Sequence, residues 1–275
     1  MSLDHPQNAW ADLPREELLA LLEYQRALGV DLGLSEAPVD RFAASMAARP
    51  RVAAPVAEAP TVVPPVPAQA GMATGPADPA ETRALATAAP TLEALRAAMD
   101  AYEGCVLKKR ATQLVFADGN PAAEIMLVGE GPGEQEDLVG KPFVGRAGQL
   151  LDRMLAAIGL DRTKVYIANM VPWRPPGNRD PSPEELALCT PFLIRQVELV
   201  APKLLVTLGN VPTKALFDTS QGITRMRGQW RDINIGNHRV KALATLHPAY
   251  LLRTPSAKSL VWQDMLSLSQ ALAGQ

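Results

Sequence analysis

Short apolar runs alternate with longer amphipathic stretches through most of the C-terminal two thirds of the chain. Runs rich in Val, Ile and Leu predict buried strands, and apolar positions at helical spacing predict helices. The expected strands are 124–129, 165–170, 203–208 and 241–246, and the expected helices are 147–158, 183–200, 211–217 and 258–272. This alternation predicts an α/β fold, a three-layer α/β/α sandwich with a central four-stranded parallel sheet.

Local capping signals set two of the helix starts. Ser182 is suited to be an N-cap, Pro183 to be the first helical residue, and Glu185 to complete a capping box. Thr91 is a similar N-cap for a helix that continues to about residue 103. We therefore expect the folded domain to span residues 91–275.

The N-terminal third has a different pattern. Residues 12–28 read as an amphipathic helix within a region spanning 1–45, and its leucines form an apolar face. This face is suited to pack on the main domain, on a twin helix or on a protein partner. Residues 46–90 predict a disordered Ala/Pro-rich linker, since 50–90 holds 9 prolines and 13 alanines and few large apolar residues.

The overall charge of −2 is unevenly distributed. Residues 1–95 carry a net charge of −6, whereas the remainder carries +4. A mildly basic folded half is compatible with a polyanionic partner. The two cysteines indicate a reducing compartment, and we see neither a signal peptide nor an apolar run long enough for a membrane span. We therefore expect a cytoplasmic protein with no membrane association.

The candidate chemistry gathers where the expected strands end. The segment 125–148 is an apolar strand that leads into a turn of glycines and acids, including Glu130 and Glu136. Asn169 ends the second strand and His247 follows the last. Because parallel strands place their carboxyl ends at one edge, these side chains should meet there, with Phe143 in a nearby loop.

The glycine spacing argues against a nucleotide-cofactor enzyme. A dinucleotide fingerprint needs G-x-G-x-x-G and an acid about 20 residues on. Gly129, Gly131 and Gly133 have a different spacing, and Glu134 stands where the third glycine belongs. The carboxylates of this turn would also repel a free phosphate.

Four motifs, in order, carry a resemblance that extends from about Thr91 to the C-terminus. They are GEGPGEQED, KPFVGRAGQLLDRML, VYIANMVPWRPPGNRDP and LHPAYLLR. Together they resemble the uracil-DNA glycosylase superfamily, and family 4 in particular. The resemblance implies an enzyme that flips uracil out of DNA and hydrolyses its N-glycosidic bond, leaving an abasic site for base excision repair.

The resemblance also implies roles for the matched residues. Phe143 would stack on the flipped base, and Asn169 would pair with uracil and reject cytosine. His247 would donate to the developing uracil anion. Glu130 and Glu136 would position or deprotonate water, because Gly131, in the uracil pocket, replaces the aspartate that family 1 uses.

The resemblance further implies contacts with the DNA partner. Leu251 and Leu252 would form an apolar wedge, and Arg253 and Arg174 would meet phosphates. A helix that packs its leucines inward is an equally good interpretation of the same segment. We expect the protein to act on uracil-containing DNA as a monomer.

Family 4 enzymes typically hold a [4Fe–4S] cluster on four cysteines. The matching positions in this chain are Tyr102, Cys105, Trp173 and Cys189. Two thiolates cannot satisfy a four-cysteine site, so we expect no metal and no cofactor, with the aromatic rings filling the volume. Two further functions stay open: a related glycosylase with altered base preference, and a catalytically weak binder of uracil or abasic DNA.

Overall fold

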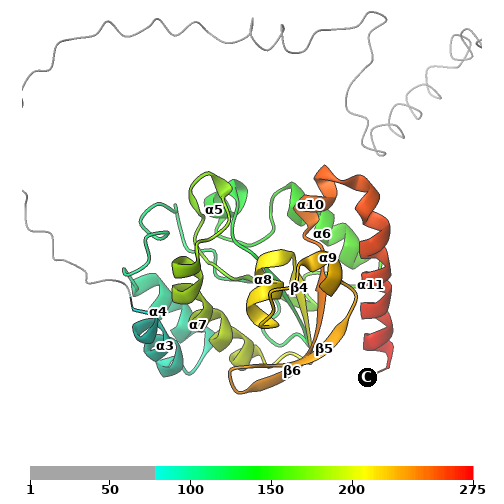
Figure 1. The fold of residues 1–275 in the computed structure, drawn as a ribbon. Helices are drawn as coiled ribbons and strands as arrows, with labels where there is room; N and C mark the ends of the chain where they lie inside the picture. The colour runs from blue at the N-terminus through cyan, green and yellow to red at the C-terminus, as the bar shows by residue number, and fades with distance from the viewer. Residues whose placement is uncertain (1–77, 275) are drawn as a thin grey trace, which may run out of the picture. The chain divides into compact units, whose positions relative to one another are not determined.

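A computed structural model describes residues 78–274 (Figure 1). The predicted helix at 12–28 and all but the end of the predicted linker lie outside these residues. Within the described part, no helix has the length and apolar character needed to cross a membrane.

The core of the fold is a six-stranded mixed sheet with the order β1-β3-β2-β4-β6-β5. Its four central strands are mutually parallel and are the four that the sequence predicted. They are β2 (Ile125–Gly129), β3 (Val165–Asn169), β4 (Leu204–Leu208) and β6 (His238–Thr245). The α/β class is therefore confirmed, and the parallel centre with it.

The prediction of only four strands was wrong, because two antiparallel strands close the edges. At one edge β1 (Asp118–Gly119) pairs with β3, and at the other β5 (Trp230–Ile235) forms a hairpin with β6. β1 is too short to show a period. β5 is an edge strand whose side chains are mostly exposed or half-buried, so it lacks the apolar run that marks the central strands.

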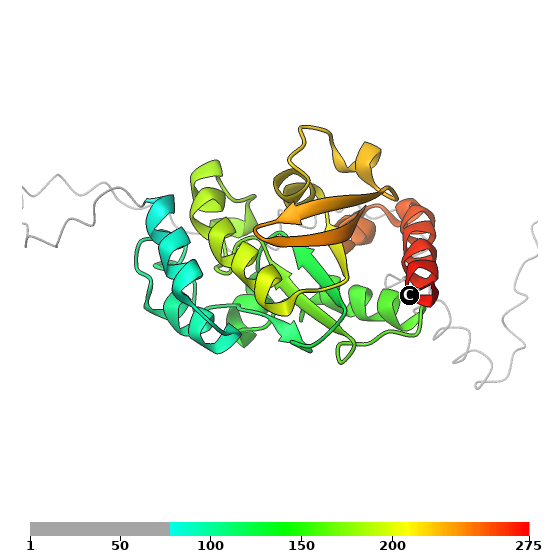
Figure 2. The same ribbon diagram turned by 90° about the horizontal axis from the view of Figure 1, so that it is seen from below.

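Helices cover both faces of the sheet (Figures 1 and 2). Alternate strand residues face opposite layers: Ile125 and Leu127 belong to one apolar cluster, Met126 and Val128 to the other. The first cluster includes α6 (Arg146–Ala156) and α11 (Lys258–Ala273). The second includes α7 (Pro183–Val200), α8 (Asn210–Leu216) and α9 (Ile223–Met226). This is the expected three-layer arrangement.

The folded part begins earlier than predicted. Helix α4 (Leu92–Ala101) has Thr91 as its N-cap, as expected, but α3 (Pro79–Ala88) lies inside the segment assigned to the linker. Its Ala86 is buried in a third apolar cluster with α4 and α7, and Arg195 of α7 donates to the carbonyl of Ala89. The composition masked this helix, because alanine and proline suit a capped helix start as well as a linker.

Short helices follow the sheet's carboxyl edge. They are α5 (Glu134–Val139), η1 (Pro176–Asn178), α10 (Pro248–Arg253) and η2 (Pro255–Ala257). The labels α5 and α10 in Figure 1 mark this edge of the molecule.

Candidate active site

A cavity of about 420 Å³ lies at the carboxyl edge of the sheet. Three segments line it, each following a parallel strand: the turn and loop after β2, the loop after β3, and the start of α10 after β6. The predicted residues that line it are Glu130, Gly131, Glu136, Phe143, Asn169, His247 and Arg253. The sequence expectation that strand ends bring these side chains together is thus confirmed by the fold.

Asn169 lies at the cavity floor, at the last position of β3 and in register with Gly129 of β2. Its side chain is buried, and its Oδ1 has no hydrogen-bond partner among the described residues. A Cβ on Gly129 would collide with this oxygen and would lie 2.6 Å from Cζ of Phe143. Glycine at the strand end therefore makes room for a buried amide whose oxygen has no hydrogen-bond partner among the described residues.

Phe143 lies beside the amide, in the loop between α5 and α6. Its ring is buried, with its centroid 5.5 Å from that of His247 and a tilt of 31° between the planes. Its φ of 55° is unusual for a residue with a side chain. The backbone on either side must therefore be held in place, and the residue held there is one of those that line the cavity.

His247 is the N-cap of α10. Its Nδ1 accepts a hydrogen bond of 3.1 Å from the backbone N–H of Ala249. Because that nitrogen is an acceptor, the neutral ring carries its proton on Nε2. Burial lowers the pKa of His247 to about 4, the Arg253 charge adds to this, and Glu136 opposes it. The residue is therefore a neutral hydrogen-bond donor at physiological pH.

Glu130 is a half-buried carboxyl at the mouth of the β2 turn. Burial raises its pKa to about 7, and the nearby Asp180 carboxylate adds to the effect. A carboxyl with this pKa can exchange a proton near neutral pH, as a general base or acid must. Asp180 lies in the loop after β3 and lines the same cavity.

Glu136 has a different position from the one expected of a water-binding group. Its carboxylate accepts hydrogen bonds from the backbone N–H groups of Val144 at 2.9 Å, Gly145 at 2.8 Å and Gly133 at 3.1 Å. These bonds use most of its acceptor capacity. Glu136 therefore holds the loop that carries Phe143, whereas the Glu130 side chain shares a hydrogen bond with the Asp180 carboxyl.

Two glycines in the turn leave space that a side chain would close. A Cβ on Gly131 would lie 2.7 Å from Cγ2 of Val171, and one on Gly133 would lie 2.8 Å from Oε2 of Glu136. An acid at position 131 would need Val171 to move.

The predicted DNA-contacting residues divide into three groups. Leu251 is buried in the first apolar cluster, so the prediction of an exposed wedge does not fit it, and Leu252 is half-buried against the same cluster. Arg253 is exposed at the cavity rim. Arg174 lies outside the cavity, and its Nε donates to Oδ1 of Asn178 at 2.8 Å. The inward-packing alternative is correct for Leu251.

The sequence did not point to Asp180 or Arg162. Asp180 could have been found as an acid in a Pro/Gly-rich loop after a strand end. Arg162 lies in the turn before β3 and donates to the backbone carbonyls of Pro142 and Phe143. Nothing in the local pattern of residues 160–164 indicates this contact.

The four positions that the resemblance assigns to cluster cysteines meet in the third apolar cluster. Tyr102, Cys105, Trp173 and Cys189 are all buried there, and Tyr102 makes an edge contact with Phe192 at 5.8 Å. The contact between the two thiols lowers the pKa of Cys105 to about 7. Two thiols and two aromatic rings do not fit a cluster that needs four thiolates. In residues 78–274, no group of three His, Cys, Asp or Glu side chains is arranged to bind a metal ion.

Comparison with known proteins agrees with this geometry. The family model for the uracil DNA glycosylase superfamily matches residues 116–266. A type-4 uracil-DNA glycosylase of Saccharolobus solfataricus is 40% identical over 176 residues, which cover 62% of this chain and 82% of the relative. That of Archaeoglobus fulgidus is 41% identical over 170 residues (60% and 85%), and that of Thermotoga maritima 45% over 153 residues (55% and 78%). Because this family model matches more than half of the chain, the chain belongs to the uracil DNA glycosylase superfamily.

Proposed function

We propose that this protein is a uracil-DNA glycosylase of base excision repair, which hydrolyses the N-glycosidic bond of uracil in DNA and leaves an abasic site. One observation carries the proposal. A stacking ring, a buried amide with an unpaired oxygen, a neutral imidazole donor and a proton-exchanging carboxyl line one cavity, in a chain similar to type-4 uracil-DNA glycosylases. Those are the groups that base excision requires.

The first task is to capture a flipped base. Extrusion costs a few kcal/mol, least for a mispaired base. Phe143 stacks on the uracil ring, and the Asn169 amide accepts from N3–H and donates to O4. Cytosine places an amino donor at the O4 position, so it would leave the amide without a good partner. The carboxylate of Glu136 lies beside Gly133 and limits the space on that side of the cavity.

The second task is to break the bond from C1′ to N1. The bonding electron pair leaves on uracil, and the Nε2–H of neutral His247 donates a hydrogen bond to the developing oxyanion. Glu130 orients a water molecule, which adds its oxygen to C1′ while its proton passes to the Glu130 carboxylate. Arg253, which lines the cavity, would meet a DNA phosphate.

A direct assay tests the function. Purified protein is incubated with single- and double-stranded oligonucleotides that carry uracil, hypoxanthine or thymine opposite guanine, and abasic sites are then cleaved with alkali. Scission at uracil alone supports the proposal. Scission mainly at another base supports a shifted preference, and binding to uracil DNA without scission supports a catalytically weak binder.

Asn169→Ala should reduce the single-turnover rate of uracil excision. Loss of two base-pairing hydrogen bonds at about 1 kcal/mol each corresponds to roughly tenfold to hundredfold. Asn234→Ala on the exposed face of β5 is the matched control and should keep the wild-type rate. A wild-type rate for Asn169→Ala would contradict the assignment of Asn169 to the uracil edge.

We also propose that the protein works without an iron–sulfur cluster. This rests on the aromatic rings at two of the four cysteine positions. The purified protein is expected to lack both iron and the visible absorbance of a cluster, and Cys189→Ala should remain active. Stoichiometric iron and sulfide in the active protein would contradict this.

The remaining parts of the proposal concern partners. We propose that the protein acts on uracil-containing DNA as a monomer. We further propose a cytoplasmic protein whose predicted N-terminal helix recruits a protein partner. Deletion of residues 1–77 should then leave excision of uracil from oligonucleotides unchanged.

A further inference from the structure

We propose that Arg162 is a positioning residue for uracil excision, which acts by holding the backbone of Phe143 in the conformation that aims its ring at the base. Arg162 itself does not line the cavity. The inference rests on the proposed role of Phe143 in stacking, and it adds a residue whose function the sequence motifs do not indicate.

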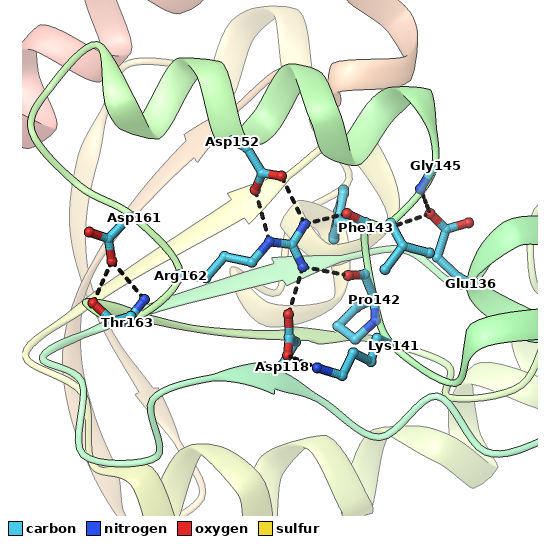
Figure 3. Close-up of polar contacts among 11 residues, drawn as sticks. Asp118, Glu136, Lys141, Pro142, Phe143, Gly145, Asp152, Asp161, Arg162 and Thr163 are labelled. Carbon is cyan, nitrogen blue, oxygen red and sulfur yellow. Dashed lines mark hydrogen bonds and ion pairs between the residues drawn. The ribbon is translucent and has the colours of Figure 1, made fainter.

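The Arg162 guanidinium lies at the centre of a network that joins four segments (Figure 3). Its Nη1 donates to Oδ2 of Asp118 at 2.7 Å and to the carbonyl of Pro142 at 3.1 Å. Its Nη2 donates to the carbonyl of Phe143, and its Nε donates to Oδ1 of Asp152 at 2.9 Å. Arg162 thus ties the edge strand β1 and helix α6 to the loop.

The contacts on the loop are made where its backbone is unusual. Phe143 has a φ of 55°, which costs free energy for a residue with a side chain. Arg162 binds the carbonyls of residues 142 and 143 on one side, while Glu136 binds the N–H groups of residues 144 and 145 on the other. Three consecutive peptide groups, from 142–143 to 144–145, are therefore fixed by two side chains of opposite charge.

The charges around Arg162 explain why it stays in place. Asp118 and Asp152 both pair with it, and Asp118 also pairs with Lys141 at 3.1 Å. The guanidinium side chain is 25% exposed, so the network is partly shielded from solvent. The planar fork of arginine can reach two carboxylates and two carbonyls at once, which a lysine ammonium cannot do.

The loop that carries Phe143 packs closely on the helix beneath it. A Cβ on Gly148 of α6 would collide with the carbonyl group of Phe143, so the loop lies directly on the helix backbone. The carbonyl is thus enclosed between α6 and Arg162. A small displacement at this point would tilt the Phe143 ring, and misplacement of about 1 Å in an active site can cost roughly 10²-fold in rate.

Arg162→Lys keeps the positive charge and removes the fork. We expect a roughly 10- to 100-fold lower single-turnover rate on uracil DNA, with less than about threefold change in affinity for DNA that carries an abasic-site analogue. Arg153→Lys is the matched control, because Arg153 is an exposed arginine on α6 next to Asp152, and it should behave as the wild type. Asp152→Asn is a milder second variant and should show a smaller loss of rate.

A double-mutant cycle separates positioning from a general loss of structure. If Arg162 acts through Phe143, then Arg162→Lys should cost less than about threefold in a Phe143→Ala background. The proposal would be overturned if the rate losses of the two single variants multiplied in the double variant. It would also be overturned if Arg162→Lys weakened binding to abasic DNA as much as it lowered the excision rate. If Phe143→Ala excised uracil at the wild-type rate, the stacking role of Phe143 would be overturned. If Phe143→Ala lowered the excision rate but Arg162→Lys did not, only the positioning role of Arg162 would be overturned.

Discussion

Replacing His247 with alanine is expected to lower the rate of uracil excision by about 10²- to 10³-fold, the usual effect of removing one preorganised oxyanion donor. The Nδ1 atom of this ring accepts from the N–H of Ala249, so the donor that would be lost is Nε2–H. The pKa of about 4 keeps the ring neutral above about pH 5, and His247 should therefore add no inflection to the rate profile near neutral pH. Single-turnover kinetics from pH 5 to pH 9 measure both effects.

A second variant separates catalysis from helix capping. Alanine also removes the N-cap of α10, at about 1 kcal/mol, whereas asparagine is itself a favoured N-cap. His247→Asn should therefore keep the thermal stability of the wild type and still show the lower rate of uracil excision. His238→Ala, at the opposite end of β6, is the control for histidine removal and should remain active. An active His247→Asn would exclude the donor role.

Glu130→Gln is expected to reduce excision by about 10²-fold, because a glutamine cannot accept the proton of the attacking water. In the wild type the pKa of about 7 means that the ionised base is lost as pH falls, so the rate should drop roughly tenfold per unit below about pH 6. Asp180→Asn should move this inflection to lower pH, since it removes the neighbouring negative charge. Glu134→Gln, an exposed acid on α5, is the matched control. A pH profile unchanged by Asp180→Asn would contradict the effect of the Asp180 charge on the pKa of Glu130.

Glu130→Gln should also raise the stability of the folded protein at alkaline pH. The folded state holds the Glu130 proton more tightly than the unfolded state, whose carboxyl has the usual pKa of 4.5. The contribution of Glu130 to stability is therefore largest below pH 4.5 and is lost as pH rises through about 7. Glu130→Gln lacks this loss, so it should be more stable than the wild type at pH 8, by on the order of 1 kcal/mol after solvent screening, and similar at about pH 4. Denaturant unfolding at both pH values measures the difference.

Some of the site could be predicted because strand ends are predictable. Asn169 and His247 each follow an apolar run, and parallel strands bring their carboxyl ends to one edge whatever the intervening sequence. The same logic missed β5, whose side chains are mostly exposed, and α3, whose alanines and prolines resembled a linker. Local pattern predicts the buried elements well and the peripheral ones poorly.

The roles of individual side chains were harder to predict. Glu130 and Glu136 are equivalent as acids in one glycine-rich turn, yet only the second is occupied by three backbone N–H groups. Leu251 and Leu252 are adjacent leucines, and the first is buried in the core. In both pairs the difference depends on which neighbouring segment packs against the side chain.

The sequence by itself determined the alternation of elements, the strand ends that form the site and the two cysteine positions that have become aromatic. These follow from periodicity, capping and residue identity, which are local. Only the tertiary structure decided that Glu136 and Arg162 hold the Phe143 loop, that Asp180 lies near Glu130, and that Nδ1 of His247 accepts from the N–H of Ala249. Arg162 and the carbonyl of Phe143 are 19 residues apart along the chain. Contacts of this kind arise from how loops pack on helices and strands, which no local pattern encodes.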